Sequence, residues 1–184
     1  MSIEMPEATI LARQMQAELP GRTVSGFELR SCESLQRMGF VNKDPDEFSR
    51  LVGQTVESVV SRGNTIVVKL TGQQDLVLAP EYGGEILFHK NADSYPARYH
   101  FRLDMADGSA LTVRIITMGS IYATCDDGLG GHYMVRRDFV PEIPEPTDDA
   151  LTLERFAEAL GGVNRQLKPV LVGKDAVVVG LCPH

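Results

Sequence analysis

Cysteine is scarce in this sequence of 184 residues, and the three cysteines, Cys32, Cys125 and Cys182, lie far apart. No two of them have the Cys-x-x-Cys spacing of a structural zinc site, and three cysteines cannot all pair in disulfides. The pattern disfavours a disulfide scaffold and favours a reducing, cytoplasmic environment. The four histidines are scattered as well. We therefore predict no metal site and no cofactor.

Long hydrophobic runs and nucleotide-binding or hydrolase signatures are missing too. No apolar stretch reaches the roughly 18 residues that span a bilayer. The first seven residues, MSIEMPE, have neither the basic region nor the apolar core of a secretory signal. The sequence contains no P-loop and no GxGxxG, HExxH or GxSxG motif. These absences argue against a membrane partner and against the most easily recognised enzyme classes.

Basic residues are outnumbered, with 18 Lys and Arg against 25 Asp and Glu, which gives a formal net charge of −7. A protein whose main task is to hold a polyanion usually shows a basic surface. The composition of the whole chain therefore leans against nucleic-acid binding, although a local basic patch is compatible with it. Apolar residues make up 43% of the chain, which is enough for a hydrophobic core and excludes disorder as the main state.

The hydrophobic pattern predicts a helix followed by many short strands. Pro6 suits a first helical turn, and Ile10, Leu11, Met15 and Leu19 follow at helical spacing, so we expect a helix over residues 7–18. After it the period changes to two. Strands are expected over residues 22–32, 54–60, 65–70, 76–79, 85–89, 99–105, 110–116 and 120–125. Asp-Gly at 107–108 is a hairpin signal, and strands at this spacing favour a sandwich or barrel.

The C-terminal part has a different character. Residues 141–149 contain three prolines and four acids, which predicts an extended linker. Thr152 is a good N-cap for a helix ending at Leu160, and a second short helix is expected around residues 165–172. We therefore expect an α+β fold: an N-terminal helix on a two-layer antiparallel β-sandwich (residues 1–140), the linker (141–149) and a short C-terminal helical segment (150–184). An insertion at residues 33–50 is expected to carry a short helix.

Three short motifs occur in order along the chain. They are IEMPEA at residues 3–8, PEP at 144–146, and LKP at 167–169 followed by VVVG at 177–180. In this order and spacing they resemble the formamidopyrimidine-DNA glycosylase and endonuclease VIII family. That family begins Pro-Glu-x-Pro-Glu and carries Pro-Glu-Pro and Ile-Lys-Pro segments before its helix-two-turns-helix motif. The resemblance covers the whole chain.

The resemblance implies DNA glycosylase and AP-lyase chemistry in base-excision repair. In the family, an N-terminal proline amine attacks the sugar of a flipped, damaged nucleotide and forms a Schiff base, while the neighbouring glutamate handles protons. A strand lysine and a helix-two-turns-helix asparagine hold phosphates. An arginine and an aromatic residue fill the space left by the flipped base, and a zinc ribbon usually completes the DNA clamp.

The family residues carry over only in part. Glu4 matches the catalytic glutamate, and Ser2 would supply a primary amine in place of the proline once the initiator methionine is removed. Asn64 stands near the family's strand lysine, Tyr82 lies in the segment that would intercalate, and Lys168 lies in the LKP motif. The resemblance therefore implies Glu4 and Ser2 as catalytic residues and Asn64, Tyr82 and Lys168 as DNA contacts. The loop of the base-replacing arginine is replaced by IITMG at 115–119, and the zinc ribbon is missing.

Two interpretations of function follow, with a third open. The first is a diverged DNA glycosylase/AP lyase that acts on damaged DNA, with Glu4 as acid/base and either the Ser2 amine or a water as nucleophile. The second is a non-catalytic binding module that kept the sandwich, lost the DNA clamp and works through a protein partner; the acidic balance and the missing phosphate ligands favour it. The third is a fragment whose remaining residues carry the DNA-binding half. For this chain alone, the charge count predicts weak, nonspecific DNA binding, with a dissociation constant of about 10⁻⁴ M near physiological salt.

Overall fold

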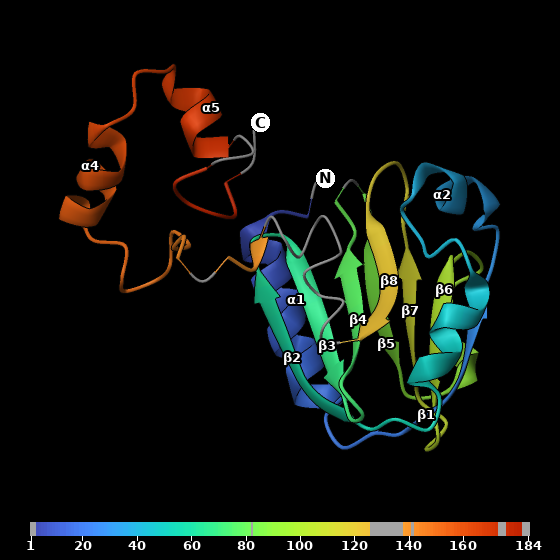
Figure 1. Cartoon of the computed structure of the whole chain (residues 1–184). Helices are drawn as coiled ribbons and strands as arrows, with labels where there is room; N and C mark the ends of the chain where they lie inside the picture. The colour runs from blue at the N-terminus through green and yellow to red at the C-terminus, as the bar shows by residue number, and fades with distance from the viewer. Residues whose placement is uncertain (1–2, 82, 126–137, 141, 173–175, 182–184) are drawn as a thin grey trace.

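Two four-stranded antiparallel sheets make up most of the computed structural model, and the N-terminal helix lies beside β2 and β3 (Figure 1). The structure describes residues 3–81, 83–125, 138–140, 142–172 and 176–181. One sheet has the order β1-β6-β7-β5 and the other β2-β3-β4-β8. The strands are β1 (Val24–Leu29), β2 (Val56–Arg62), β3 (Thr65–Leu70), β4 (Gln74–Ala79), β5 (Glu85–His89), β6 (Phe101–Met105), β7 (Ala110–Arg114) and β8 (Ser120–Cys125). The predicted fold class, a helix on a two-layer antiparallel sandwich with short C-terminal helices, is confirmed.

The core fills the space between the two sheets. Ile66 and Leu78 from one sheet and Phe101 and Leu103 from the other have no exposed surface. Phe48 joins them from outside the sheets, with its ring centroid 5.0 Å from that of Phe101. Burial of a side chain of this size contributes about 1.5–3 kcal/mol relative to leaving it exposed. Packing between strands that are distant in the sequence therefore stabilises the sandwich, which in turn positions the surface loops.

Helix α1 (Met5–Glu18) begins two residues earlier than predicted because Glu4, not Pro6, marks its boundary. Glu4 is the N-cap, and its backbone N–H donates to Glu7 Oε2 at 3.2 Å as one half of a capping box. The predicted apolar face was partly wrong, since Ile10 is 54% exposed. The buried face consists of Ala8, Ala12, Met15 and the adjoining Leu19.

Two hairpins set the register of the strands. Arg62 pairs with Thr65, so β2 extends two residues beyond the prediction and Gly63-Asn64 forms a two-residue turn. Gly63 has φ +56°, a conformation in which glycine is favoured. The predicted hairpin at Asp107-Gly108 is confirmed by the antiparallel pairing of β6 with β7.

The insertion carries α2 (Glu33–Met38) and the 3₁₀ helix η1 (Pro45–Leu51), in line with the expected short helix. Its connecting segment covers the free edge of β8. Ile121 N–H donates to Phe40 O at 2.8 Å, and Ala123 exchanges two hydrogen bonds with the Asn42 side chain, at 2.8 and 3.0 Å. Covering an edge strand in this way protects it from pairing with another chain.

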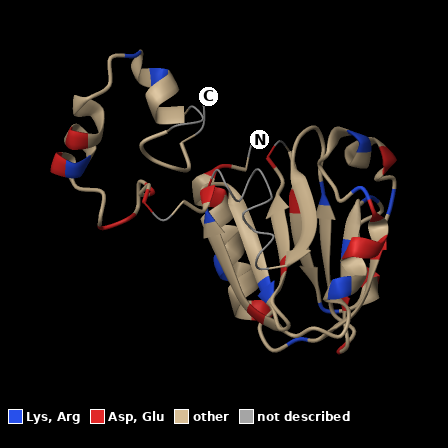
Figure 2. Ribbon diagram, viewed as in Figure 1, with Lys and Arg blue, Asp and Glu red and all other residues tan. Residues whose placement is uncertain are grey.

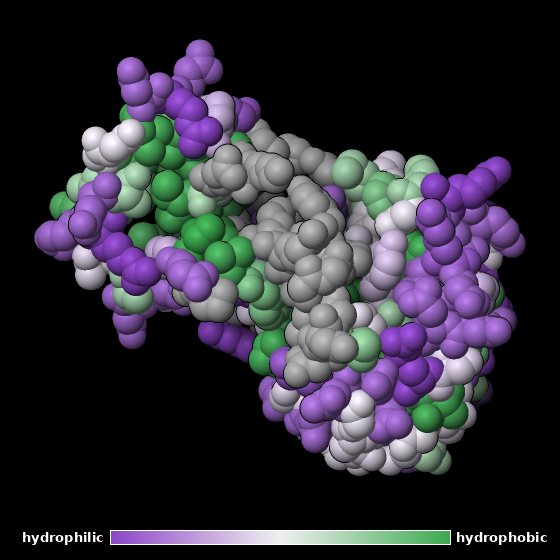
Figure 3. All heavy atoms as spheres, in the orientation of Figure 1, coloured by the Kyte–Doolittle hydropathy of each residue, from purple (hydrophilic) through white to green (hydrophobic). Residues whose placement is uncertain are grey.

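Helices α4 (Leu153–Gly161) and α5 (Leu167–Val172) lie to one side of the sandwich in Figure 1. The Thr152 N-cap is confirmed, because its Oγ1 accepts from Arg155 N–H at 3.2 Å. The preceding linker is not extended: turns run through it, closed by hydrogen bonds such as Asp148 N–H to Glu145 O at 3.0 Å. Hydrophobic residues gather on the C-terminal part that carries α4 and α5 in the view of Figure 3. Within the described residues, no helix combines the length and apolarity needed to cross a membrane.

Candidate functional site

The start of α1 holds the catalytic position predicted from the sequence, but the nitrogen beside Glu4 is not an amine. Ile3 precedes Glu4, and its backbone N–H donates to Glu81 O in the β4–β5 loop at 2.7 Å. An amide nitrogen that is acylated by the preceding residue and engaged in a hydrogen bond has no nucleophilic lone pair to offer. Glu4 itself is half-buried and occupied by its role as the helix N-cap. The geometry gives Glu4 a structural role here.

Asn64 is near Glu4 but faces the protein. Its side chain is 7% exposed, and its Nδ2 donates to Glu81 Oε1 at 3.3 Å. Glu81 thus connects the β2–β3 turn with the start of α1, through its side chain and its backbone carbonyl respectively. A buried amide committed to a neighbouring carboxylate is poorly placed to meet a phosphate. Its predicted DNA contact stays a prediction.

The linker docks onto the same turn. Gly63 N–H donates to Glu145 Oε1 at 2.6 Å, and Arg62 donates to the Ile143 carbonyl and lies 3.9 Å from Asp148. Burial raises the pKa of Glu145, while the Gly63 N–H and Arg62 act in the opposite direction. These contacts hold the linker, which leads to α4, against the β2–β3 turn of the sandwich.

Acidic groups dominate this end of the molecule. Arg62 lies 3.9 Å from Asp148 and interacts with Glu145, on which Asp138 and Asp148 also act. Glu4, Glu7 and Glu81 belong to the contacts described above. Figure 2 shows the same concentration of acidic residues at the start of α1 and along the linker. Such a surface repels a phosphate backbone. The N-terminal end is therefore not the part of the described surface best suited to hold DNA.

The other predicted site residues are not brought together with Glu4. Lys168 is exposed on α5, and no hydrogen bond or ion pair links it to Glu4 or Asn64. Ser2 and Tyr82 lie outside the described residues. Among the residues that the structure does describe, no group of three or more His, Cys, Asp or Glu side chains could hold a metal ion.

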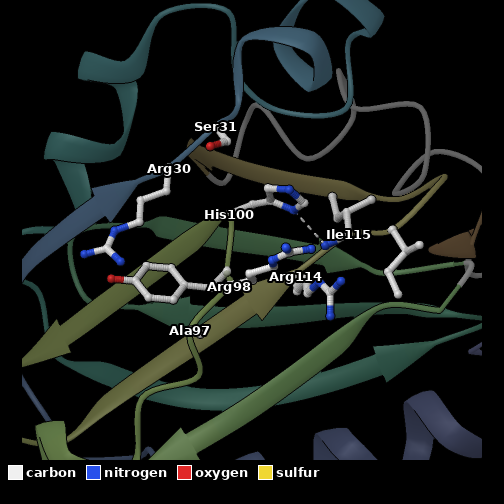
Figure 4. A pocket seen from close by; sticks show the side chains of 9 residues that line it. Arg30, Ser31, Ala97, Arg98, His100, Arg114 and Ile115 are labelled. Carbon is white, nitrogen blue, oxygen red and sulfur yellow. Dashed lines mark hydrogen bonds between the residues drawn. The ribbon is translucent and has the colours of Figure 1, made fainter.

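A second candidate site, which the sequence did not reveal, is a cationic pocket of about 370 Å³. Its basic residues are Arg30 after β1, Arg98 and His100 before β6, and Arg114 at the end of β7. Figure 4 shows these side chains around the opening. The remaining lining residues are Ser31, Ala97, Tyr99, Ile115 and Ile116. We refer to this site as the arginine pocket.

The arginines of this pocket differ in how far they are neutralised. Arg98 is exposed and forms no ion pair with any described residue. Arg114 lies 3.7 Å from Glu85, a long contact between partly exposed groups that contributes little in water. Arg30 donates to Glu28 Oε1 at 2.6 Å and lies over the Tyr99 ring, 4.5 Å from its centroid. Arg98 and Arg114 therefore provide most of the positive charge available to a ligand.

His100 contributes a neutral donor to the arginine pocket. Its Nδ1 accepts from Ile115 N–H at 3.0 Å, shown as the dashed line in Figure 4. Burial, and then the positive charge of Arg114, lower the pKa of His100. The neutral ring therefore carries its hydrogen on Nε2.

The β4–β5 loop joins the arginine pocket to the start of α1. Glu81 accepts from Ile3 at one end of this loop. At the other end, a Cβ added to Gly83 would lie 3.0 Å from Ile116 Cδ1, so the Ile116 side chain packs against the loop. Ile116, which lines the pocket, is 53% exposed, and Met118, two residues further along the loop, is 44% exposed. The pocket thus has an apolar rim at Ile116.

The pocket was missed because its residues come from three separate stretches of the chain, 30–31, 97–100 and 114–116. Arg30, Arg98, His100 and Arg114 follow no period, and Arg98 and His100 are separated by an aromatic residue that packs on the sheet. The nearest signal is the run Arg-Tyr-His at 98–100, of which Tyr99 and His100 fall within the strand predicted over residues 99–105.

Comparisons with known proteins agree with the fold. The family model described as the formamidopyrimidine-DNA glycosylase N-terminal domain matches residues 3–115. A formamidopyrimidine-DNA glycosylase of Chloroflexus aurantiacus is 25% identical over 176 residues, which cover 95% of this chain and 59% of that protein. One from Moorella thermoacetica is 31% identical over 139 residues, covering 73% and 48% respectively.

Solved structures show the same likeness. The Lactococcus lactis formamidopyrimidine-DNA glycosylase, non-covalently bound to DNA containing an AP site, superposes with a TM-score of 0.76 at 20% identity. The match covers 97% of this chain and 64% of that one. A MutM complex with DNA containing carbocyclic 8-oxo-G also gives 0.76, at 18% identity. The chain therefore spans less than two thirds of the length of these relatives.

Proposed function

Because the chain belongs to the formamidopyrimidine-DNA glycosylase family, we propose that it binds DNA in base-excision repair and does so without Schiff-base chemistry. The family match includes the N-terminal helix and the strands up to β7. In this proposal residues 1–140 form the sandwich domain, 141–149 the linker and 150–184 the helical segment. The protein acts in the cytoplasm, where its scattered cysteines stay reduced.

The arginine pocket is the observation that carries the DNA-binding part. Arg98 and Arg114 offer planar, always-charged groups suited to phosphate oxygens, and His100 adds a neutral Nε2–H donor. The exposed Ile116 and Met118 next to them provide an apolar surface that a base can contact. Relatives in solved structures are bound to DNA containing an abasic site or a damaged base. We take damaged DNA as the ligand class on this basis.

The Ile3 amide supports the absence of Schiff-base chemistry. A Schiff base to an abasic sugar requires a free amine, and the nitrogen next to Glu4 is an amide bound to Glu81 O at 2.7 Å. At the same end, Asn64 is buried against Glu81, and the Arg62 guanidinium is engaged with the Ile143 carbonyl and Asp148. The sandwich then serves recognition, with the arginine pocket as its phosphate contact.

A salt titration tests the binding part. The probe is a labelled duplex of about 12 base pairs with one tetrahydrofuran abasic site, measured by fluorescence anisotropy between 25 and 150 mM salt. The variant Arg98→Ala/Arg114→Ala removes up to two phosphate contacts. Its slope of log affinity against log salt should fall by about 1–2, since each phosphate contact contributes roughly 0.9.

The matched control is Arg13→Ala/Arg50→Ala. Both arginines are exposed, neither lines the pocket, and the change in net charge is the same. This control should keep the slope of the unmodified protein to within about 0.5, because net charge alone does not create a phosphate contact. Equal slopes in the two double variants would contradict the assignment of the pocket.

A borohydride-trapping assay on abasic-site duplex tests the second part. We expect no covalent adduct, because trapping requires a free amine at the sugar. An adduct that maps by mass spectrometry to the Ser2 amine would overturn the non-lyase proposal and restore Ser2 and Glu4 as a catalytic pair. An adduct on a lysine would also contradict it, since Schiff-base chemistry would then be present.

A further inference from the structure

The His100 ring is committed to a backbone amide through one of its nitrogens. Ile115 N–H donates to His100 Nδ1 at 3.0 Å. A backbone amide can only donate in this direction, so Nδ1 must keep its lone pair and the hydrogen of the neutral ring must sit on Nε2. The geometry alone therefore fixes the tautomer.

The backbone of His100 is held on both sides. His100 N–H donates to Val113 O at 2.9 Å, and its carbonyl accepts from Arg30 N–H at 2.8 Å and from Cys32 Sγ at 3.1 Å. The Ile115 side chain is buried in the core, and the exposed residues 116–118 of the β7–β8 loop follow it at once. If the contact between the ring and the Ile115 amide breaks, residues 116–118 are therefore the part of the loop that can move.

Burial and the positive charge of Arg114 oppose the protonation of His100. Arg98 from the segment before β6 and Arg30 after β1 line the same pocket. The Cys32 thiol, which donates to the His100 carbonyl, is neutral, since burial raises its pKa to about 11. The carboxylates of Glu28 and Glu85 are already engaged with Arg30 and Arg114.

We propose that His100 is a positioning residue that works only in its neutral form: Nδ1 holds the β7–β8 loop at the rim of the arginine pocket, while Nε2–H faces the bound phosphate. The inference rests on the proposed function, because it concerns the same pocket. Protonation places a hydrogen on Nδ1, which then meets the Ile115 N–H donor to donor, and the start of the loop loses this hydrogen bond.

The consequence runs against the usual behaviour of histidine. At an ordinary phosphate site, acid strengthens binding because the imidazolium adds a positive charge. Here acid removes the hydrogen bond to the Ile115 amide, next to Ile116 in one wall of the pocket. Affinity for DNA should therefore decrease as the pH falls through the lowered pKa of His100, although the net charge of the protein becomes more positive.

Two variants separate the two nitrogens. Asparagine presents an oxygen near the position of Nδ1 and has no donor at the position of Nε2, so His100→Asn keeps the loop anchor. In His100→Gln the longer side chain places its amide near the position of Nε2, and the hydrogen bond from the Ile115 N–H is lost. Affinity for the abasic-site duplex described above is measured at about pH 7.5 and pH 5.5, a range in which phosphodiesters do not titrate, with folding checked by circular dichroism.

The unmodified protein should bind the duplex roughly three- to ten-fold more weakly at the lower pH, the effect of losing about one hydrogen bond. His100→Asn should bind more weakly than the unmodified protein at pH 7.5 and show little further change in acid. His100→Gln should already resemble the acid form at pH 7.5. Tighter binding of the unmodified protein in acid would overturn the inference.

A second readout does not depend on DNA. In ¹⁵N-labelled protein, the His100 ring should show the Nε2–H tautomer, and the Ile115 amide resonance should titrate with the same midpoint as the ring. An Nδ1–H tautomer, or an Ile115 amide that ignores the titration, would refute the coupling. Absence of duplex binding at pH 7.5 would instead refute the proposed function, while the resonances still decide the role of His100.

Discussion

Replacing Gly63 by alanine should destabilise the protein far more than a glycine-to-alanine change usually does. Gly63 has φ +56°, and a Cβ built on it would lie 2.7 Å from Asp138 Cγ and 2.8 Å from Asp138 Oδ2. Asp138 cannot simply turn away, because it is 2% exposed and its Oδ2 accepts from Thr65 Oγ1 at 2.6 Å. The β2–β3 turn, the segment before the linker and β3 meet at this one position.

The expected cost has two parts. A non-glycine residue in the left-handed region costs about 1–2 kcal/mol. Displacing a buried carboxylate from its hydrogen bond adds about 1.5–3 kcal/mol, the usual range for a bond to a charged group. We therefore expect Gly63→Ala to lower the free energy of unfolding by roughly 3 kcal/mol, measured by urea denaturation followed by circular dichroism.

Gly53→Ala is the matched control, because Gly53 has φ +82° and a Cβ there would meet nothing within 4 Å. It should show the backbone part alone, about 1–2 kcal/mol. In an Asp138→Ala background, Gly63→Ala should cost about as much as Gly53→Ala, giving a coupling energy near 2 kcal/mol. An equal loss in the free energy of unfolding for Gly63→Ala and Gly53→Ala would contradict the proposed clash with Asp138. So would an additional loss for Gly63→Ala that persists in the Asp138→Ala background.

Two further predictions concern titratable groups. Burial lowers the pKa of His89, whose ring nitrogens lie 3.0 Å from Ser94 Oγ and 2.8 Å from Thr112 Oγ1. Since the unfolded chain then binds the proton more readily, the free energy of unfolding should decrease as the pH falls below about 6.5. This decrease should be smaller in His89→Gln, and an equal decrease in urea titrations of both proteins would contradict it. Burial raises the pKa of the Cys32 thiol to about 11. Iodoacetamide at pH 8 should therefore leave Cys32 unmodified in the native protein and modify it in urea, as peptide mapping would show; rapid native alkylation would contradict its burial.

Much of the fold was predictable because the strands are short and strongly patterned. The ranges 65–70, 85–89 and 120–125 agree with β3, β5 and β8 residue for residue. Errors occurred where side-chain chemistry decides a boundary. Arg62 reads as a turn residue, but its backbone pairs with Thr65. Ile10 reads as core, but the buried stripe of α1 uses alanines, which let the helix approach β2 closely.

The site was much less predictable than the fold. The resemblance drew attention to Glu4 and Asn64, whose side-chain types fit chemistry, and the structure places both in contacts that stabilise the protein. The arginine pocket depends on which chain segments one sheet, with the order β1-β6-β7-β5, brings to the same end. Arg30 and Arg114 are 84 positions apart and carry no motif. Only the register of β1 with β6 and of β6 with β7 brings them near each other.

The net charge and the arginine pocket lead to opposite expectations about DNA, and the location of the charges resolves the conflict. A charge count averages over the whole surface, but at physiological salt an exposed charge acts over only about 8 Å. Glu145 and Asp148 contact the β2–β3 turn and Arg62 and do not line the arginine pocket, where Arg98 and Arg114 lie. A duplex held at the pocket is therefore attracted locally even though the protein as a whole is acidic. The acids outside the pocket would act mainly on the rate at which protein and DNA meet. The affinity should therefore depend on Arg98 and Arg114 more strongly than the net charge of −7 suggests.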